Sequence, residues 1–162
     1  WVLDDDWQLR LLEFDLEPFG GYETDRSIAF AHTYYLRGDL ENAAVFAENA
    51  RTELAEQLEE FPDDPDANPL MGVALAYLGQ RDAAIEFGRK GVELYETRPG
   101  VPYPYSQLQL VRIHTILGQA EPALDNLEPL LEVPFYITPG WLRIDPMFDP
   151  LREHPRFHAL VE

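Results

Sequence analysis

Apolar residues recur every three or four positions along much of the chain, a spacing that places them on one face of an α-helix. The longest example covers residues 40–61, with apolar positions at Leu40, Ala43, Ala47, Ala50, Leu54, Leu58 and Phe61. Shorter apolar stretches cover residues 28–36, 70–78 and 108–117, and a further helical face is marked by Ala84, Phe87, Gly91 and Tyr95. The pattern predicts a succession of helices.

One short phrase occurs three times, as LRGDLENAA, LGQRDAAI and LGQAEPAL. Its glycines, Gly38, Gly79 and Gly118, are 41 and 39 residues apart. The same two intervals separate three alanines: Ala43, Ala84 and Ala123. Each glycine follows an apolar stretch, where a left-handed residue commonly ends a helix, and Asp39 can cap the helix that follows. The repeating unit is therefore predicted to be helix, tight turn, helix.

A pair of helices this short cannot cover its own apolar face, so neighbouring pairs must stack and share a core. Ala31, Gly72, Ala84 and Gly91 leave room for helices to approach closely. The sequence therefore predicts an all-α fold in a single domain over residues 1–162. Its expected parts are a leading helix in 1–22, repeats in 23–62, 63–100 and 101–134, and a C-terminal cap in 135–162.

The repeat resembles the tetratricopeptide repeat, whose first helix carries a Leu-Gly-x-x-Tyr phrase and whose second helix is rich in alanine. The matching positions are Phe30, Ala31 and Tyr34 in the first unit, Met71, Gly72 and Leu75 in the second, and Leu110, Val111 and His114 in the third. The resemblance implies a right-handed α-solenoid of antiparallel helix hairpins with about three repeats. Pro129 is expected to interrupt the last second helix, because its ring removes a backbone hydrogen bond.

Both ends of the chain resemble a narrower group. The phrase TPGWLRIDPMFDPLREHPRF, residues 138–157, is similar to the closing segment of repeat regions that follow bacterial serine/threonine protein kinases, and WVLDDD at the start is similar to a phrase upstream of those repeats. This resemblance implies a regulatory or scaffolding region of a larger bacterial signalling protein. A start at Trp1 also suggests a piece of a longer chain.

The C-terminal segment contains two helix-start signals, Asp145-Pro146 and Asp149-Pro150, in which a capping carboxylate precedes a proline. We expect short helical turns there. Their apolar side chains are expected to cover the last repeat, as solenoid caps do: Trp141, Leu142, Ile144, Phe148, Leu151 and Phe157.

At the other end, Trp7, Leu11 and Phe14 have helical spacing, and the carboxylates of residues 4–6 suit a helix N-terminus. The expected structure is a leading helix left from an incomplete repeat. It predicts a partly uncovered apolar edge.

Thirty acidic and twelve basic residues give a net charge of −18. This charge repels nucleic acid and anionic membrane surfaces and favours a basic partner. The chain has no cysteine, which excludes disulfides and zinc-thiolate sites. No apolar run reaches the roughly 20 residues of a membrane helix, so we expect a soluble domain, whether cytoplasmic or extracytoplasmic.

Two motifs have the spacing of metal ligands. His154 and His158 could share one helical face, but a catalytic zinc ion needs a third protein ligand. Asp64, Asp66 and Asn68 resemble the start of a calcium loop, yet a proline follows where that loop needs glycine. No GxSxG or GxxxxGK phrase occurs. We therefore expect no enzyme activity, cofactor or metal, and keep a metal-dependent hydrolase as a minor alternative.

The tetratricopeptide resemblance implies that first helices line a concave groove that binds a protein or peptide. Carried over to this sequence, the groove residues are Asp25, His32, Tyr35, Val73, Tyr77, Tyr105, Arg112 and Thr115. Aromatic and arginine anchors suit such a groove, although tyrosines at these places are as readily explained by packing. The expected partner is a protein, a peptide or an upstream domain of the same polypeptide. The alternative is a structural spacer or oligomerisation element.

Overall fold

The structure is a computed structural model that describes residues 3–96 and 104–162. Within these residues it is all-helical and contains no strand, which confirms the predicted fold class. The elements are α1 (Asp5–Leu11), η1 (Glu17–Phe19), α2 (Glu23–Leu36), α3 (Leu40–Glu60), α4 (Ala67–Tyr77), α5 (Arg81–Glu96), α6 (Pro104–Ile116), α7 (Ala120–Leu127), η2 (Glu128–Leu131), α8 (Pro139–Ile144), η3 (Pro146–Leu151) and α9 (Pro155–Val161), with η denoting a 3-10 helix. None of the described helices combines the length and apolar character needed to cross a membrane.

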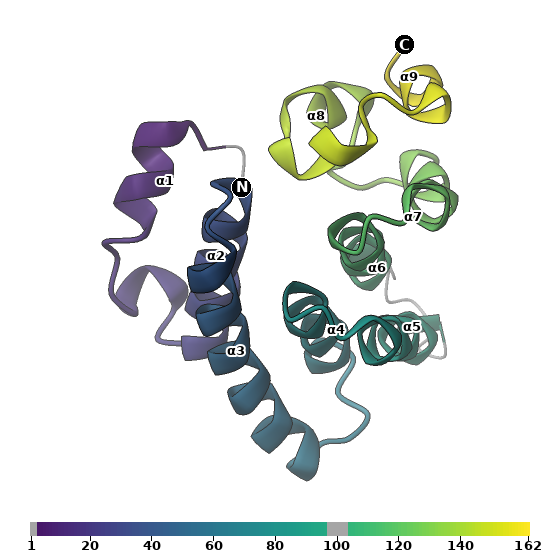
Figure 1. Ribbon diagram of the computed structural model, residues 1–162. Coiled ribbons are helices and arrows are strands. Elements are labelled where there is room, and N and C mark those ends of the chain that lie inside the picture. The colour runs from purple at the N-terminus through teal and green to yellow at the C-terminus, as the bar shows by residue number, and fades with distance from the viewer. Residues whose placement is uncertain (1–2, 97–103) are drawn as a thin grey trace.

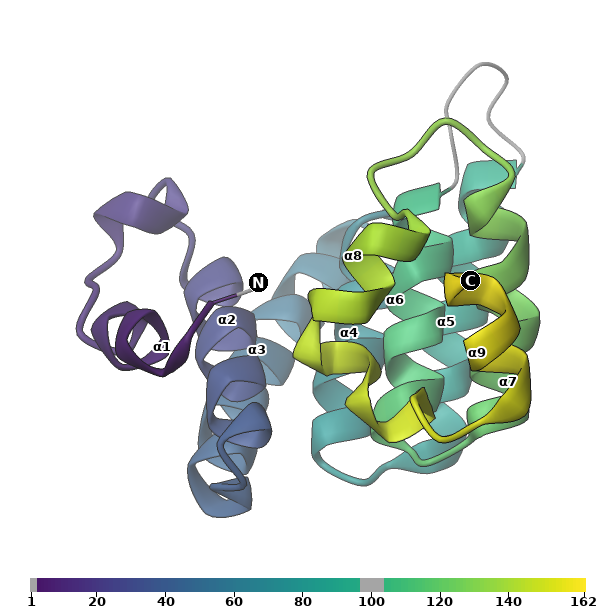
Figure 2. The same cartoon turned by 90° about the horizontal axis from the view of Figure 1, so that it is seen from above.

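The longer helices pack in consecutive pairs, α2 with α3, α4 with α5 and α6 with α7 (Figure 1). Neighbouring pairs also touch, because α3 packs against α4, and α6 packs against both α4 and α5. The contact between α2 and α4 is slight by comparison. Seen from above, α1, α2 and α3 lie at one end, while α8 and α9 lie over α6 and α7 (Figure 2).

The three corners between paired helices have one and the same geometry. Gly38, Gly79 and Gly118 have φ angles of 77°, 71° and 68°, in the left-handed region that favours glycine. At each corner the glycine amide donates to the carbonyl three residues earlier, and the next amide donates to the carbonyl five residues earlier. These two bonds satisfy carbonyls that the helix end leaves open. The predicted role of the three glycines is confirmed.

Aspartates begin two of the helices, as the sequence predicts. The carboxylate of Asp4 accepts a hydrogen bond from the Trp7 amide at 2.9 Å at the start of α1. Asp39 accepts one from the Asn42 amide at 3.1 Å at the start of α3. Each bond satisfies an amide that has no partner within the helix.

Two glycines let α4 and α5 lie directly against one another. A Cβ at Gly72 would lie 2.7 Å from the carbonyl oxygen of Ala84 and 2.9 Å from the amide nitrogen of Gly88. A Cβ at Gly91 would lie 2.6 Å from the ring of Pro69. These separations are shorter than any ordinary van der Waals contact, so the backbones can come this close only without the side chains.

The first pair uses bulky aromatic side chains instead. The rings of Phe30 and Phe46 meet edge to face with centroids 5.0 Å apart, and Tyr34 stacks on Phe46 at 5.5 Å. Phe19 of η1 approaches Phe30 at 6.1 Å. Aromatic pairs in these geometries add to the stabilisation that comes from burying their area.

Helix α6 belongs to two apolar clusters. Leu110 and Ile113 pack with residues of α2 to α5, whereas Leu108 and Val111 pack with α7 and the C-terminal segment. Along this helix every residue from 106 to 115 is buried. The two clusters therefore share one central element.

The C-terminal segment forms α8, η3 and α9, which confirms the expected short helical turns. Leu142, Phe148, Leu151 and Phe157 are buried against α6 and α7 as predicted. Ile144 is 59% exposed, so its predicted place in this core is wrong. It is the last residue of α8, before Asp145 turns the chain into extended backbone.

One of the two predicted helix starts is also wrong. Asp145 does begin η3, accepting a hydrogen bond from the Met147 amide at 2.9 Å. Asp149-Pro150 instead lies inside η3, and α9 begins at Pro155 after His154, whose Nδ1 accepts a hydrogen bond from the Arg156 amide at 3.3 Å. The carboxylate of Asp149 pairs with Arg152 at 2.5 Å and caps no new helix, because η3, which starts at Pro146, continues past it.

Ion pairs also hold α9 onto α7 and η2. The Arg156 guanidinium lies 2.5 Å from Glu121, 2.9 Å from Asp125 and 2.8 Å from Glu128. The predicted interruption near Pro129 is confirmed, because α7 ends at Leu127 and continues as the 3-10 helix η2.

The leading helix is shorter than predicted. α1 ends at Leu11, so Phe14 lies outside it, and no residue of α1 is buried. The expected uncovered apolar edge is confirmed by Trp7, Leu9 and Phe14, which are 48%, 49% and 38% exposed. An ion pair of 3.3 Å between Arg37 and Asp5 links α1 to the first corner.

We expect Gly72→Ala to destabilise the protein by about 1–3 kcal/mol, because the new Cβ would force the backbones of α4 and α5 apart. Urea unfolding followed by circular dichroism measures the change. Gly140→Ala is the matched control, since Gly140 is exposed in α8 and its nearest atom would be 3.8 Å away. The control should keep or slightly raise stability. Equal stability of both variants would contradict the close packing of α4 on α5.

Candidate functional site

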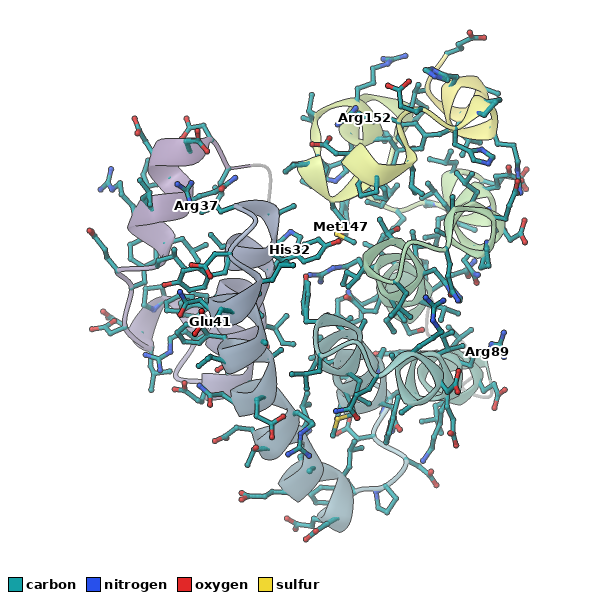
Figure 3. The ribbon with its side chains drawn as sticks, viewed as in Figure 1. His32, Arg37, Glu41, Arg89, Met147 and Arg152 are labelled. Atoms are coloured by element: carbon teal, nitrogen blue, oxygen red, sulfur yellow. The ribbon has the colours of Figure 1, made fainter. Side chains whose placement is uncertain are left out.

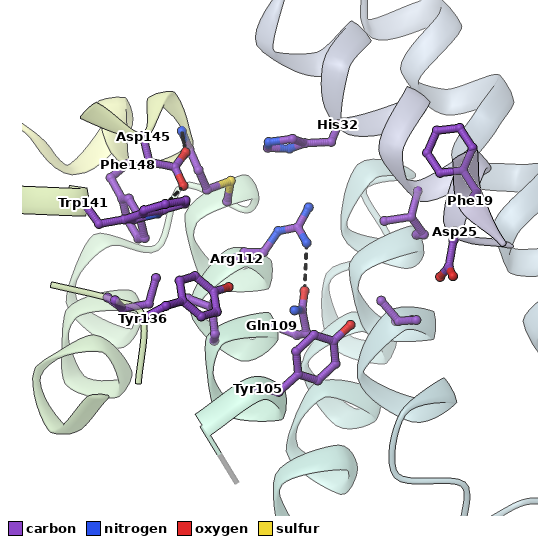
Figure 4. A pocket seen from close by; sticks show the side chains of 15 residues that line it. Phe19, Asp25, His32, Tyr105, Gln109, Arg112, Tyr136, Trp141, Asp145 and Phe148 are labelled. Carbon is purple, nitrogen blue, oxygen red and sulfur yellow. Dashed lines mark hydrogen bonds between the residues drawn. The ribbon is translucent and has the colours of Figure 1, made fainter. Parts of the chain in front are cut away.

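A cavity of about 210 Å³ lies between α2, α6 and the C-terminal segment (Figure 4). Because α2 touches α4 only slightly, it leaves room beside α6, and the C-terminal segment encloses that room from the other side. Figure 3 shows His32 and Met147 directed toward one another across it. The lining residues are Phe19, Asp25, Ile28, His32, Leu70, Tyr105, Leu108, Gln109, Arg112, Tyr136, Ile137, Trp141, Asp145, Met147 and Phe148.

A buried polar chain runs across the first helices of the three pairs. Nδ1 of His32 on α2 lies 2.8 Å from the hydroxyl of Tyr77 on α4. Arg112 on α6 lies near the same hydroxyl, and its positive charge acts on Tyr77.

Burial and charge both keep His32 neutral. The side chain is 2% exposed, and this burial, followed by the positive charge of Arg112, lowers the pKa of His32 well below its usual value. Burial likewise raises the pKa of Tyr77, although Arg112 opposes the shift. The chain therefore consists of one cation and two neutral groups near pH 7.

Arg112 brings a positive charge into the cavity. It is 8% exposed, and its Nη1 donates to Oε1 of Gln109 at 2.9 Å. Figure 4 shows the guanidinium in the middle of the cavity, above Gln109 and Tyr105. A buried cation is tolerated only where polar groups surround it, and Gln109 and Tyr77 are two of those groups.

The positive charge of Arg112 also acts on two tyrosines that line the cavity. Burial raises the pKa of Tyr105 and of Tyr136, and the charge of Arg112 opposes both shifts. The two tyrosines are nevertheless 37% and 49% exposed, so each presents part of its ring to solvent. Both tyrosines line the cavity.

Asp145 serves mainly to hold the C-terminal wall in place. Its Oδ2 accepts from the Trp141 indole at 2.9 Å, and its Oδ1 accepts from the Met147 amide at the same distance. The residue is 6% exposed. Both carboxylate oxygens are thus engaged, and the indole of Trp141 is fixed against the cavity.

Asp25 has a different environment on the opposite wall. Burial raises the pKa of its carboxyl group, yet the residue as a whole is exposed. Within residues 3–96 and 104–162, no hydrogen bond or ion pair to this carboxylate is found. The same charge also acts on Tyr105 across the cavity.

The structure brings four of the eight expected groove residues to the cavity, namely Asp25, His32, Tyr105 and Arg112. Tyr77 lies behind them in the polar chain, and the ring of Tyr35 contacts it with centroids 5.3 Å apart. Val73 and Thr115 are 0% and 2% exposed and do not line the cavity. The reason is that α4 and α6 are packed on several sides rather than along one face.

Sequence reasoning missed the contribution of the C-terminal segment to the site. Trp141 and Phe148 were expected only as a cover for the last repeat, but they also face the cavity. The missed lining residues with polar or aromatic side chains are Phe19, Gln109, Tyr136, Trp141, Asp145 and Phe148. The density of aromatic residues in 135–148 is the only sequence signal that points to them.

The two motifs with metal-ligand spacing have structural roles. His154 caps the start of α9, and its Nε2 lies 3.2 Å from Glu121. Asp64 accepts hydrogen bonds from the Asp66 and Ala67 amides at 2.9 Å, as expected of a capped linker. In the part of the chain that the structure describes, no group of three or more His, Asp or Glu side chains could hold a metal ion.

Comparison with known proteins adds no assignment. No family model matches the chain, and no curated protein matches it.

Protonation of His32 should be linked to unfolding. Because its folded pKa is lowered, the unfolded chain takes up a proton first as the pH falls below about 6.5, so stability is lost on acidification. The loss attributable to this group approaches about 1.4 kcal/mol per pH unit. We expect His32→Gln to lose stability less steeply than the wild type between pH 7 and pH 5 in urea unfolding.

His114→Gln provides a graded comparison. Burial lowers the pKa of His114 as well, but a hydrogen bond to Gln119 at 2.7 Å opposes the shift. Its effect on the pH dependence should be smaller than that of His32→Gln. If the stability of His32→Gln falls with pH as steeply as that of the wild type, His32 is not kept neutral by the fold.

Proposed function

We propose that this chain is a non-catalytic interaction module, an α-solenoid of three tetratricopeptide-like helix hairpins with a leading helix and a C-terminal cap. In this proposal it regulates or scaffolds a larger bacterial signalling protein. Its parts are the leading helix in residues 1–22, the repeats in 23–62, 63–100 and 101–134, and the cap in 135–162. The observation that carries the proposal is the cavity between α2, α6 and the C-terminal segment, with its aromatic walls and central arginine.

The repeated glycine turn between paired helices supports an architecture of helix hairpins. The same two backbone bonds and the same left-handed glycine recur at Gly38, Gly79 and Gly118, and each corner is followed by a buried alanine. Contacts of α3 with α4 and of α5 with α6 are those expected when hairpins stack in sequence. Stacked hairpins place their first helices on one side, where α2 and α6 line the cavity.

The chemistry of the cavity supports recognition of a protein or peptide. Partly exposed Tyr105 and Tyr136 offer large rings at a small entropic cost, and tyrosine and arginine dominate binding hot spots. The net charge of −18 favours a partner with a basic surface around the part that enters. An upstream domain of the same polypeptide would meet the same requirements.

A second candidate is an oligomerisation element, and one observation favours it. Trp7 and Leu9 on α1 are 48% and 49% exposed. Exposed apolar side chains on one short helix are typical of a self-association surface. This candidate uses α1 and leaves the cavity without a role.

Selection of binding peptides from a random displayed library on the whole chain tests the proposal. Peptides that bind the wild type should lose at least about tenfold in affinity for a Tyr105→Ala, Tyr136→Ala double variant, because each hot-spot ring contributes about 1–2 kcal/mol or more. Affinity is measured by fluorescence anisotropy, and circular dichroism confirms that the variant is folded.

Val45→Ser is the control, because Val45 is 51% exposed on α3 and does not line the cavity. It should bind the selected peptides as the wild type does. If Val45→Ser and the double variant bind equally well, and Leu9→Ser changes the sedimentation coefficient, the oligomerisation element is the better description.

A further inference from the structure

The volume of the cavity limits what can enter it. An apolar cavity of about 150 Å³ binds benzene, so the volume of about 210 Å³ here accommodates a somewhat larger ring system. It is also below the range of roughly 300–1,000 Å³ that is usual for drug-sized ligands. A single large side chain therefore fits the cavity better than a length of peptide.

The walls of the cavity are largely apolar and are held in place by the fold. Leu108, Met147 and Phe148 are buried members of one apolar cluster. The indole of Trp141 is fixed by its hydrogen bond to Asp145 at 2.9 Å. Walls that are already ordered lose little entropy when a flat, rigid ring packs against them.

The charges around the cavity favour a neutral guest. The positive charge of Arg112 acts on Tyr105 and Tyr136, so it also opposes the entry of a lysine or arginine side chain. Asp25 and Asp145 line the same cavity and oppose the entry of a carboxylate or a phosphate group. The group that meets both conditions is uncharged.

Arg112 favours an aromatic guest over an aliphatic one. A guanidinium is attracted to the face of an aromatic ring, most strongly to that of tryptophan. This attraction acts through the electron-rich face of the ring, so the hydrogen bonds of Arg112, including the one to Gln109 at 2.9 Å, stay in place. Indole thus combines a suitable size with the strongest attraction to the cation.

Asp25 sets a requirement for the residues next to the ring. It lines the cavity, the residue is exposed, and no hydrogen bond or ion pair to its carboxylate is found among the described residues. Its raised pKa indicates that the negative charge is incompletely solvated. A basic residue outside the cavity would complement this charge, as it would the net charge of −18.

We propose that this cavity receives one tryptophan side chain of a partner protein, with a lysine or arginine close to it in the partner's sequence. The indole enters beside Arg112, and the basic residue stays outside, near Asp25. This inference rests on the proposed function and specifies the partner that it requires.

Isothermal titration of the whole chain with N-acetyl amides of tryptophan, phenylalanine, leucine and lysine tests the choice of side chain. We expect the tryptophan amide to bind at least about fivefold more tightly than the phenylalanine amide, because indole buries more apolar surface and attracts a cation more strongly. The lysine amide should bind least. If the leucine amide binds as tightly as the tryptophan amide, the inference is wrong.

A cavity-filling variant locates the binding site. Leu70 lines the cavity from α4 and is only partly buried, so Leu70→Trp should fill the space and weaken the tryptophan amide at least about tenfold. Val45→Trp is the matched control, exposed on α3 and outside the cavity, and should bind as the wild type does. Circular dichroism establishes that both are folded, and the titrations of the wild type need neither variant. Unchanged binding by folded Leu70→Trp would contradict the inference.

The library peptides that lose affinity for the Tyr105→Ala, Tyr136→Ala variant test the neighbouring charge. They should contain tryptophan with a lysine or arginine within two positions. Asp25→Asn should weaken them about threefold, the effect of one partly exposed ion pair. Asp82→Asn removes the same charge from the first turn of α5 and should have no such effect. An equal loss in both variants would exclude the role of Asp25.

Two outcomes separate this inference from the proposed function. Selected peptides that bind at the cavity without a tryptophan would overturn the inference and leave the proposed function in place. Binding of the tryptophan amide, together with failure of every peptide, would overturn both, because the ligand would then be a free indole compound rather than a protein.

Discussion

The arrangement of the three helix pairs depends on the buried polar chain from His32 through Tyr77 to Arg112. The bond from His32 to Tyr77 links α2 to α4, which otherwise touch only slightly. A buried arginine is costly unless polar groups surround it, and Gln109 and Tyr77 lie beside Arg112. The neutral His32 therefore helps to set α2 relative to α4 and α6, beside the cavity.

Side-chain volume explains why the cavity lies beside the first pair. Gly72 lets the backbones of α4 and α5 meet, and Gly88 makes room for Leu110 and Ile113 of α6. Between α2 and α4, the rings of Tyr35 and Tyr77 lie 5.3 Å apart and hold the helices further from each other. One helix pair is therefore set at a distance by aromatic residues, while the next two are drawn together by small ones. A repeating sequence thus produces a non-uniform stack.

Much of the fold could be predicted because its determinants are local. The left-handed glycine corner at Gly79, for example, needs only its own few residues, and so does the Asp39 cap. Only four of the eight expected groove residues line the cavity. A helix such as α4 has neighbours on several sides, and the spacing of its apolar residues does not tell which neighbour covers Val73. The role of Trp141 depends on how the C-terminal segment returns to α2, and no local signal encodes that path.

The cavity draws its walls from parts of the chain that are far apart in sequence, with Asp25 and His32 near the start and Tyr136 and Trp141 near the end. A molecule bound there touches the first helix pair and the C-terminal segment at once. It can favour an arrangement of the two only to the extent that it binds that arrangement better than others. Because Arg112 lies between them and belongs to the central helix α6, any such preference acts on the same polar chain that positions α2.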